Sequence, residues 1–223
     1  MGNYYAESLN SQKLFQVYDT AIPRIKQYFD AEIDFVRQRL KGHERVLELG
    51  AGYGRIVREL APYCASIIGM DISEESVRLG GSYLRDFPNA DMVAMDIHEM
   101  NFPHPFDVIL CLQNGLSAMR ADDSVIQRVL SYLAPGGTAY ISTYSANFWD
   151  HRLAWFQEQA DKGLLGELDM EQTKNGVIVC KDGFRATTHS PADLESIGRN
   201  SGLTYEVTEV DESSLFLILH KPS

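Results

Sequence analysis

Alternating strand and helix patterns constrain the fold of this chain more than any other feature of its sequence. Short apolar segments, each followed by a turn or a helical stretch, predict five strands, at 45–50, 66–71, 91–96, 107–112 and 138–143. Strands separated by helices pair in parallel, since a parallel pair needs a crossover connection. The pattern therefore predicts an α/β protein with a doubly wound, mostly parallel sheet.

The C-terminal part of the chain departs from this alternation. Ser190 and Asp193 form a capping box, which predicts a helix that ends at Gly202. Two further strands follow, at 203–210 and 215–220, and the short polar link between them permits an antiparallel hairpin. We therefore expect a seven-stranded sheet that ends in this hairpin.

Apolar residues three or four positions apart predict the helices. The first is expected at about 22–40, and another at about 122–133. Pro135-Gly136-Gly137 is expected to stop the second of these before the fifth strand begins. Ser73 is expected to cap the helix that follows the second strand.

Composition narrows the possible partners. The formal net charge is −11, so the surface repels a nucleic-acid backbone and an anionic membrane. No apolar run reaches the ~20 residues that cross a bilayer, and the N-terminal residues do not resemble a secretory signal. Three scattered cysteines, Cys64, Cys111 and Cys180, indicate reduced thiols and not a disulfide framework or a zinc site. These features predict a cytoplasmic protein.

A glycine cluster follows the first predicted strand. Glu48-Leu-Gly50-Ala-Gly52-Tyr-Gly54 lies where that strand turns into a helix, and glycine lets a ligand approach the backbone closely there. The dinucleotide fingerprint G-x-G-x-x-G is broken, because Arg55 occupies its last position. Glu48 would favour a cationic ligand over a pyrophosphate. A packing turn without a ligand remains the alternative interpretation.

Two aspartates occupy equivalent positions on the next strands. Asp71 ends the second predicted strand, and Asp96 ends the third. Together with Glu48 they lie at the carboxyl ends of neighbouring strands, where open α/β sheets bind ligands. A carboxylate at the Asp71 position can accept hydrogen bonds from the vicinal hydroxyls of a ribose.

These motifs resemble those of the class I S-adenosylmethionine-dependent methyltransferases. The resemblance covers about residues 44–143, and the closing hairpin agrees with it. It implies S-adenosylmethionine as the cofactor and methyl transfer to a small-molecule acceptor as the activity. By this resemblance Asp71 would hold the ribose, and Asp96 the adenine amine. The full set of implied cofactor-binding residues is Glu48, Gly50, Gly52, Gly54, Asp71, Ile72, Asp96, Ile97, Gln113 and Tyr18.

Two of those residues carry their own alternatives. Gln113 borders the methionine part of the cofactor in this reading, or is an ordinary turn residue. The family's nucleobase and glutamine methyltransferases carry Asn/Asp-Pro-Pro-Tyr here, whereas this chain has Gln113-Asn114-Gly115, which argues against nucleic-acid methylation. Tyr18, with Tyr4 and Tyr5 nearby, is expected on an N-terminal helix that covers the cofactor or only packs on the sheet.

Methyl transfer depends mainly on positioning, and needs a base only where the acceptor must lose a proton. The candidates for such a role are His151, His189 and Tyr144. No pattern of ligands predicts a metal. A non-catalytic module that binds S-adenosylmethionine or S-adenosylhomocysteine remains an alternative, and a nicotinamide-dependent oxidoreductase a less favoured one.

The chain is expected to form one domain, because 223 residues suit a single core. Residues 1–43 would be an N-terminal helical cover, and 44–143 the cofactor-binding core. Residues 191–223 would form the closing helix and hairpin. The sequence predicts no oligomeric state.

Residues 144–190 form an insertion after the fifth strand, longer than the topology requires, and we expect it to be a lid that sets substrate identity. Trp149, Leu153, Phe156 and Ala160 are expected on the packed face of its helix. Tyr144 and Arg185 could line the substrate pocket.

Overall fold

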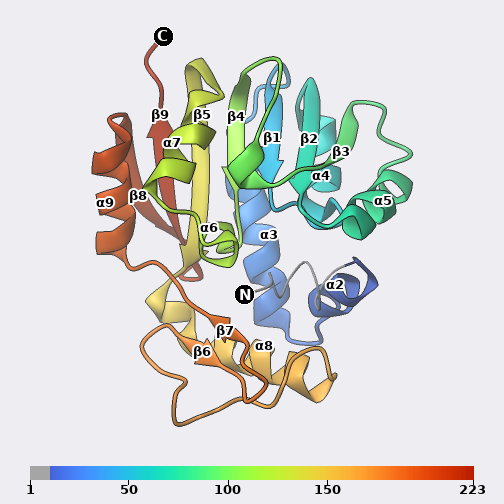
Figure 1. The fold of residues 1–223 in the computed structure, drawn as a ribbon, viewed down its shortest axis with the longest axis vertical. Coiled ribbons are helices and arrows are strands. Elements are labelled where there is room, and N and C mark those ends of the chain that lie inside the picture. The colour runs from blue at the N-terminus through green and yellow to red at the C-terminus, as the bar shows by residue number, and fades with distance from the viewer. Residues whose placement is uncertain (1–10) are drawn as a thin grey trace.

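The computed structural model describes residues 11–223, and its central feature is one seven-stranded sheet (Figure 1). The strand order is β3-β2-β1-β4-β5-β9-β8, with β9 antiparallel to both of its neighbours. This confirms the predicted doubly wound sheet and its antiparallel hairpin. The strands are β1 Arg45–Leu49, β2 Ser66–Asp71, β3 Ala90–Ala94, β4 Phe106–Cys111, β5 Leu133–Tyr144, β8 Thr204–Val210 and β9 Ser214–His220.

Helices cover both faces of the sheet, and two of their predicted caps are present. Ser73 accepts a hydrogen bond from the Ser76 amide, and Ser190 with Asp193 forms the capping box. The helices are α2 Ser11–Tyr18, α3 Pro23–Arg37, α4 Arg55–Leu60, α5 Glu74–Tyr83, α6 Gly115–Met119, α7 Asp123–Ser131, α8 Trp149–Asp161 and α9 Pro191–Ser201. Short 3₁₀ turns are η1 Ala61–Tyr63, η2 Ile97–Glu99 and η3 Ala146–Phe148.

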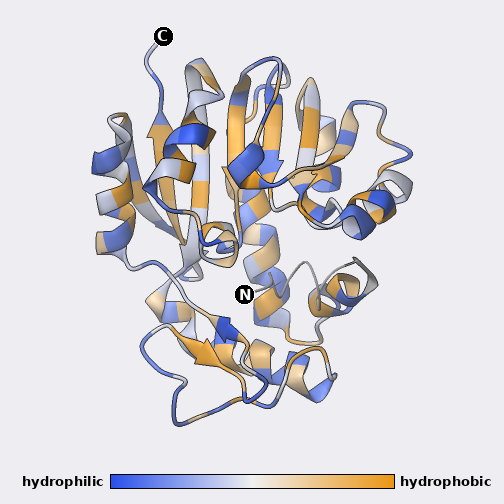
Figure 2. Ribbon diagram, in the orientation of Figure 1, coloured by the Kyte–Doolittle hydropathy of each residue, from blue (hydrophilic) through white to orange (hydrophobic). Residues whose placement is uncertain are grey.

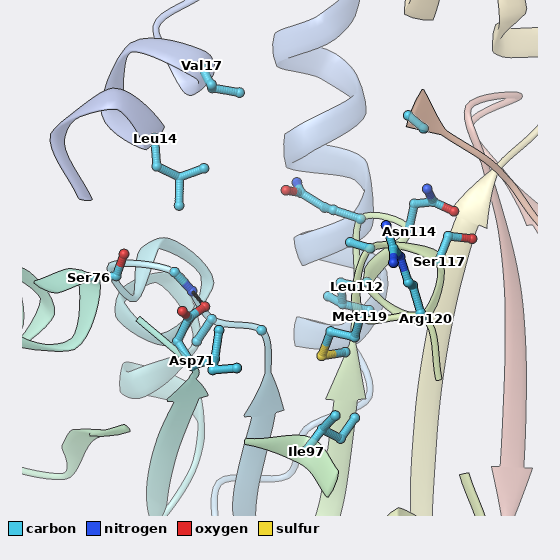
Figure 3. A pocket seen from close by; sticks show the side chains of 18 of the residues that line it. Leu14, Val17, Asp71, Ser76, Ile97, Leu112, Asn114, Ser117, Met119 and Arg120 are labelled. Carbon is cyan, nitrogen blue, oxygen red and sulfur yellow. Dashed lines mark hydrogen bonds between the residues drawn. The ribbon is translucent and has the colours of Figure 1, made fainter. Parts of the chain in front are cut away.

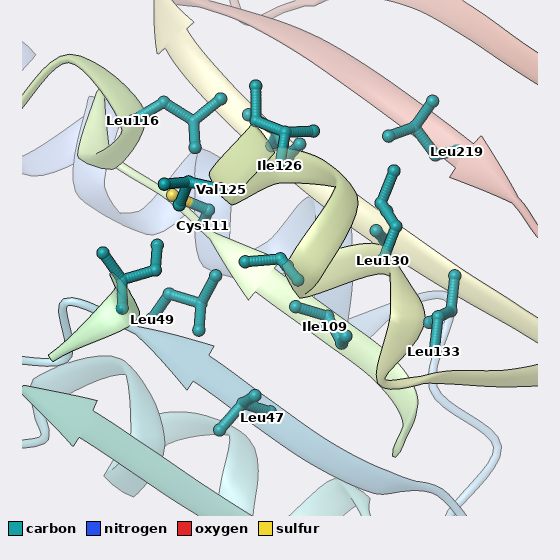
Figure 4. Close-up of a cluster of buried hydrophobic side chains, with 14 of the residues drawn as sticks. Leu47, Leu49, Ile109, Cys111, Leu116, Val125, Ile126, Leu130, Leu133 and Leu219 are labelled. Carbon is teal, nitrogen blue, oxygen red and sulfur yellow. The ribbon is translucent and has the colours of Figure 1, made fainter. Parts of the chain in front are cut away.

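Two hydrophobic cores lie on opposite faces of the sheet. Figure 4 shows the first, where Val125, Ile126 and Leu130 of α7 pack on strand residues such as Ile109. The second packs α3 and α4 on the other face, around Val57. Figure 2 shows the hydrophobic colour concentrated on the central strands, as expected for a sheet buried on both sides.

Two predicted boundaries are wrong. β3 ends at Ala94, and Asp96 lies beyond it as the N-cap of η2. Pro135-Gly136-Gly137 does not precede β5 but lies within it, since Leu133 pairs with Phe106 before the register shifts. The regular pairing of β9 with β5 starts at Thr138, and before it Gly136 and Gly137 form backbone hydrogen bonds with Lys221 and Pro222, at an irregular end of the ladder where proline and a bulge are tolerated.

The insertion forms a third core with the N-terminal helices. It contains η3, α8 and the two-residue strands β6 Ile178–Val179 and β7 Arg185–Ala186, and lies beyond the edge where the parallel strands end (Figure 1). All four residues of the predicted packed face of α8 pack on this core, with Phe156 buried and Trp149, Leu153 and Ala160 partly buried at its rim. The buried residues of α8 are Arg152, Trp155, Phe156 and Gln159.

Candidate ligand-binding site

A cavity of about 630 Å³ lies at the carboxyl ends of β1, β2 and β4, between the sheet and the insertion. In Figure 3, Leu14 and Val17 of α2 face Asp71 across this space. Its volume is in the range of small-molecule sites. The predicted residues that line it are Tyr18, Glu48, Gly50, Gly52, Asp71, Ile72, Asp96, Ile97, Gln113, Tyr144 and Arg185.

The glycine loop contributes backbone to the cavity wall. Gly50 has a φ of +67° and Gly52 a φ of +56°, a conformation that disfavours other residues. A Cβ on Gly52 would lie 2.4 Å from the Leu14 side chain. Gly54, in contrast, does not line the cavity: it precedes α4 with a φ of +85° and packs against Met92. The structure therefore places Gly54 in the turn before α4 and not in the cavity wall.

Asp71 is fixed by the loops around it. Its Oδ2 accepts a 2.8 Å hydrogen bond from the Gly52 amide, and its Oδ1 accepts one of 2.9 Å from the Ser73 amide. Burial raises the pKa of the carboxyl, while these two amides oppose the shift. Each oxygen keeps a further lone pair, so the carboxylate can still accept hydrogen bonds from a pair of hydroxyls.

Glu48 and Arg55 bring opposite charges to the same cavity. Glu48 is 3% exposed, and its Oε2 has no hydrogen-bond partner. Burial raises the pKa of Glu48 to about 8, although the nearby Arg55 guanidinium lowers it. Nε and Nη2 of Arg55 are likewise buried without a partner. Sequence reasoning used Arg55 only to exclude a dinucleotide fingerprint.

The part of the cavity near β3 is mainly apolar. Ile72 is 44% exposed there, and Ile97 and Met119 also line the wall (Figure 3). Asp96 adds a carboxylate, whose Oδ1 accepts a 2.8 Å hydrogen bond from the His98 amide. An apolar wall with one acceptor at its edge suits a flat heteroaromatic ring that carries an amine.

The turn after β4 is held by a residue that sequence reasoning missed. Gln113 and Asn114 have consecutive positive φ angles, of +53° and +64°. The Gln113 amide donates to Ser142 Oγ at 2.8 Å and to Glu32 Oε2 at 3.1 Å. Glu32 also accepts a 2.7 Å hydrogen bond from Ser214, and burial raises its pKa to about 7. The available signal was its position on the apolar face of the first predicted helix.

Asn114 connects the sheet to the insertion. Its Oδ1 accepts a hydrogen bond from Thr143 Oγ1 at 2.7 Å, and its Nδ2 donates to the Thr187 carbonyl at 2.7 Å. Its neighbour Gln113 lines the cavity, and the Nε2 atom of Gln113 is buried without a partner. Within this turn, Gln113 therefore offers a free donor to the cavity, and Asn114 holds the sheet and the insertion together.

The three candidate proton acceptors are placed differently. Tyr144 lines the cavity. His189 does not line the cavity, but its Nδ1 lies 3.0 Å from the Oγ of Ser117, which is a lining residue. Burial lowers the pKa of His189. His151 is exposed on α8 and packs its ring near Phe148, to one side of the buried stripe. The structure therefore does not bring His151 to the site.

The insertion and α2 close the cavity together. Trp155 lines the cavity and donates from Nε1 to the Val17 carbonyl at 3.2 Å, and Glu158 accepts from the Ala21 amide at 3.1 Å. Tyr18, the last residue of α2, also lines the cavity. Tyr4 and Tyr5 lie outside the described residues.

The described residues, 11–223, contain neither a cluster of metal-ligating side chains nor a membrane-spanning helix. Within this part of the chain, no three His, Cys, Asp or Glu side chains are grouped so that they could hold a metal ion. Of the helices described there, none has the length and apolar character needed to span a membrane.

Part of this chain is similar to known methyltransferases. Residues 46–137 match a family model described as a methyltransferase domain. The chain is 28% identical over 115 residues to dTDP-4-amino-2,3,4,6-tetradeoxy-D-glucose N,N-dimethyltransferase of Saccharopolyspora spinosa. The aligned residues make up 50% of this chain and 45% of that protein. The chain is 23% identical over 175 residues to the ubiquinone biosynthesis O-methyltransferase of Hydrogenovibrio crunogenus, which covers 77% and 67%. The chain thus spans about half the length of the first of these relatives.

Solved structures share the fold. The N-methyltransferase NodS from Bradyrhizobium japonicum, in complex with S-adenosyl-L-homocysteine, aligns over 100% of both chains with a TM-score of 0.59 and 16% identity. The complex of DhpI with SAH covers 94% of this chain and 91% of that chain, with a TM-score of 0.64 and 18% identity. At such identities the likeness establishes the fold alone.

Proposed function

We propose that this protein, whose core is a class I S-adenosylmethionine-dependent methyltransferase domain, transfers a methyl group from that cofactor to a small-molecule acceptor. The observation that carries the proposal is the arrangement of Glu48 and Asp71 around the glycine loop. Both carboxylates line one cavity, and Glu48 keeps a buried oxygen without a partner. A ligand with a positive charge and a ribose satisfies both.

The chain's residues fit each part of this cofactor. Gly50 and Gly52 give it close access to the backbone, and Asp71 would accept from its ribose hydroxyls. The apolar wall that includes Ile97 would hold the adenine, with Asp96 at the amine. Bound S-adenosylmethionine supplies the activated methyl group.

The other half of the cavity would orient the acceptor and exclude water. Tyr144, Trp155, Phe156 and Phe184 give it an aromatic wall. For an acceptor that must lose a proton, Ser117 would pass it to His189, because burial keeps that imidazole neutral and able to accept. This assignment makes His189 a better candidate base than the exposed His151.

The acceptor is expected to present nitrogen or oxygen. The relatives named above include an N,N-dimethyltransferase of an amino sugar and an O-methyltransferase of ubiquinone biosynthesis, which supports either atom. The net charge of −11 argues against a nucleic-acid substrate. The cysteines Cys64, Cys111 and Cys180 are buried and free, which fits a cytoplasmic location.

Calorimetry and a transfer assay test the proposal. S-adenosylhomocysteine should bind the wild-type protein, and NAD should not. Asp71→Ala should weaken the binding by about 1.5–3 kcal/mol, because charge-assisted hydrogen bonds to the ribose are lost. Transfer of a labelled methyl group to a member of an amine and phenol panel would establish catalysis. Tight binding with no transfer to any acceptor would favour a non-catalytic binding module instead.

A further inference from the structure

Arg120 and Arg185 line the cavity as unpaired cations. Arg120 caps the C-terminal end of α6, and Arg185 begins β7 in the insertion. Both are exposed, and among residues 11–223 neither side chain makes a hydrogen bond, an ion pair or a ring contact. Because the protein has a formal net charge of −11, two uncompensated cations at one cavity run against its overall charge, and they would attract an anionic ligand.

The carboxylates around the cavity form no ion pair with these arginines. Asp182 lies close to Arg185 in the chain, but its Oδ1 accepts a 3.0 Å hydrogen bond from the Phe184 amide, and its Oδ2 accepts one of 3.0 Å from the Gly166 amide. In the described part of the chain, no ion pair joins Asp182 or another carboxylate of the cavity wall to either arginine. Both guanidinium groups therefore have donors available for a ligand.

The backbone of Arg120 adopts a conformation that glycine would adopt at less cost. Its φ is +53° at the C-cap of α6, and glycine is the residue that most often takes this conformation at a helix end. Figure 3 shows the Arg120 side chain beside Ser117, three residues earlier in the chain. A long charged side chain on a strained backbone at a cavity wall indicates binding, because such strain is concentrated at ligand sites.

Two hydrogen bonds join the segments that carry the arginines. Asn114 Nδ2 donates to the Thr187 carbonyl at 2.7 Å, and Ser117 Oγ lies 3.0 Å from His189 Nδ1. The first residue of each pair lies on the turn and helix that end at Arg120, and the second lies shortly after β7. Because the same two segments carry the Ser117–His189 pair, binding at the arginines would position an acceptor relative to that pair.

A buried amide of the insertion also lacks a partner. Gln159 is 3% exposed, lies on the buried face of α8 and lines the cavity, yet its side chain makes no hydrogen bond with any described residue. A buried amide without a partner is costly, and a polar ligand in the cavity would remove this cost. Trp155, Phe156 and Phe184 line the cavity as well, so the ligand that fits has an apolar body in addition to its polar groups.

We propose that the methyl acceptor is an organic anion, whose carboxylate or phosphate group binds to Arg120 and Arg185 and whose apolar body packs on the aromatic wall. The inference rests on the proposed function, since it names the class of acceptor for that reaction. A guanidinium donates two parallel hydrogen bonds to either group, so the two arginines discriminate anionic acceptors from neutral ones of similar shape. Gln159 would bind a second polar group of the acceptor.

Calorimetry on the protein saturated with S-adenosylhomocysteine tests the proposal with three probes. Benzoate, phenyl phosphate and benzamide share a ring and differ in charge. At least one of the two anions should bind about tenfold more tightly than benzamide, and the tighter anion tells which group the site prefers. Arg120→Met and Arg185→Met should each weaken that anion about tenfold or more, the loss typical of a charged hydrogen bond, and should change the affinities for benzamide and S-adenosylhomocysteine less than about threefold.

Arg128→Met is the matched control. Arg128 is exposed on α7 and does not line the cavity, so its replacement removes one positive charge without touching the site. It should change all of these affinities less than about threefold, because charges exposed to solvent are screened over such separations.

Each contrary outcome is distinct. Equal affinities of the wild-type protein for the three probes, or no binding of either anion, would overturn the anionic acceptor. An equal loss in Arg128→Met would mean that overall charge sets the preference, and a matching loss of S-adenosylhomocysteine affinity would assign the arginines to the cofactor. If S-adenosylhomocysteine does not bind the wild-type protein, the proposed function itself fails. Should a variant not fold, the wild-type protein decides, since added salt must weaken the anion more than benzamide.

Discussion

The two walls of the cavity are built on different principles. The sheet wall, formed by the carboxyl ends of β1, β2 and β4 with their loops, presents backbone amides and carboxylates such as Asp71. The cap, formed by α2, α3 and residues 144–190, presents aromatic rings such as Trp155. The sheet wall is fixed by a continuous ladder of strand pairs, whereas the cap contains the two-residue pair of β6 with β7 and two isolated bridges.

This difference separates the two tasks of the site. Strand ladders hold in one geometry the groups of the sheet wall that we propose bind the cofactor. The cap is held by side-chain packing in its own core, which sequence changes can rebuild without altering the sheet. Glu32 joins the two, because it lies on α3 and bonds to the β4 turn and to β9.

The largest effect is expected from Trp155→Ala, which should remove the centre of the cap core. Trp155 is 4% exposed, and such a truncation costs about 3–5 kcal/mol. Hydrogen exchange should show loss of protection in α2 and in residues 144–190, while β1 and β4 stay protected. Trp149→Ala is the control, since Trp149 lies on the same helix at the rim of this core. Uniform loss of protection in both regions would contradict the separation of cap and sheet wall.

The contribution of Glu32 to the stability of the folded protein should depend on pH. Its pKa rises from 4.5 to about 7 on folding, so the neutral carboxyl is the favoured form in the folded protein. Its contribution to stability is complete below pH 4.5 and is lost as the pH rises to about 7 and beyond. At ~1.4 kcal/mol per pH unit the loss is about 3 kcal/mol.

Glu32→Gln isolates this effect, because glutamine does not titrate. The free energy of unfolding of wild type minus that of the variant, from denaturant titrations, should fall by this amount between pH 4.5 and pH 8. A difference that stays constant with pH would show that folding does not shift the pKa of Glu32, and that the joint is an ordinary charged contact.

How far the sequence predicted the structure follows the same division. The strands and the glycine loop depend on neighbours in the chain, so local patterns placed Asp71 and Gly52 correctly. Glu32 contacts Gln113, which lies 81 positions away in the sequence. Trp155 contacts Val17, which lies 138 positions away. No periodicity encodes such contacts. The misplaced Asp96 and Pro135 fall at strand ends, where pairing with a neighbouring strand, not local preference, sets the boundary.

The backbone at Gly52 forms part of the sheet wall. Gly52 and Gly163 both have positive φ angles, and an alanine at either should cost folding on the order of 1 kcal/mol. Only a Cβ at Gly52 meets a neighbour, Leu14, and enters the cavity, whereas nothing lies within 4 Å of one at Gly163. Gly52→Ala should therefore weaken S-adenosylhomocysteine about 10- to 100-fold by calorimetry, the equivalent of the ~1–3 kcal/mol cost of overpacking. Equal affinities of the two variants for S-adenosylhomocysteine would show that the ligand does not closely approach the backbone at Gly52.

The smallest effects are expected at two helix caps, Ser73 beside the sheet wall and Ser190 at the end of the insertion. Ser73 Oγ accepts from the Ser76 amide at 3.2 Å, and Ser190 Oγ accepts from the Asp193 amide at 3.2 Å. Ser73 is 7% exposed, so alanine there leaves a buried amide without a partner, whereas water can reach the exposed amide after Ser190→Ala. We expect losses in unfolding free energy of about 1–2 kcal/mol for Ser73→Ala and about 0.5 kcal/mol for Ser190→Ala. Ser73→Ala should also weaken S-adenosylhomocysteine, because loss of the Ser73 Oγ contact with the Ser76 amide loosens the loop whose backbone amide at position 73 holds Asp71 Oδ1. An equal cost at both sites, with unchanged ligand affinity, would mean that the buried loop beside Asp71 tolerates the same rearrangement as the exposed end of the insertion.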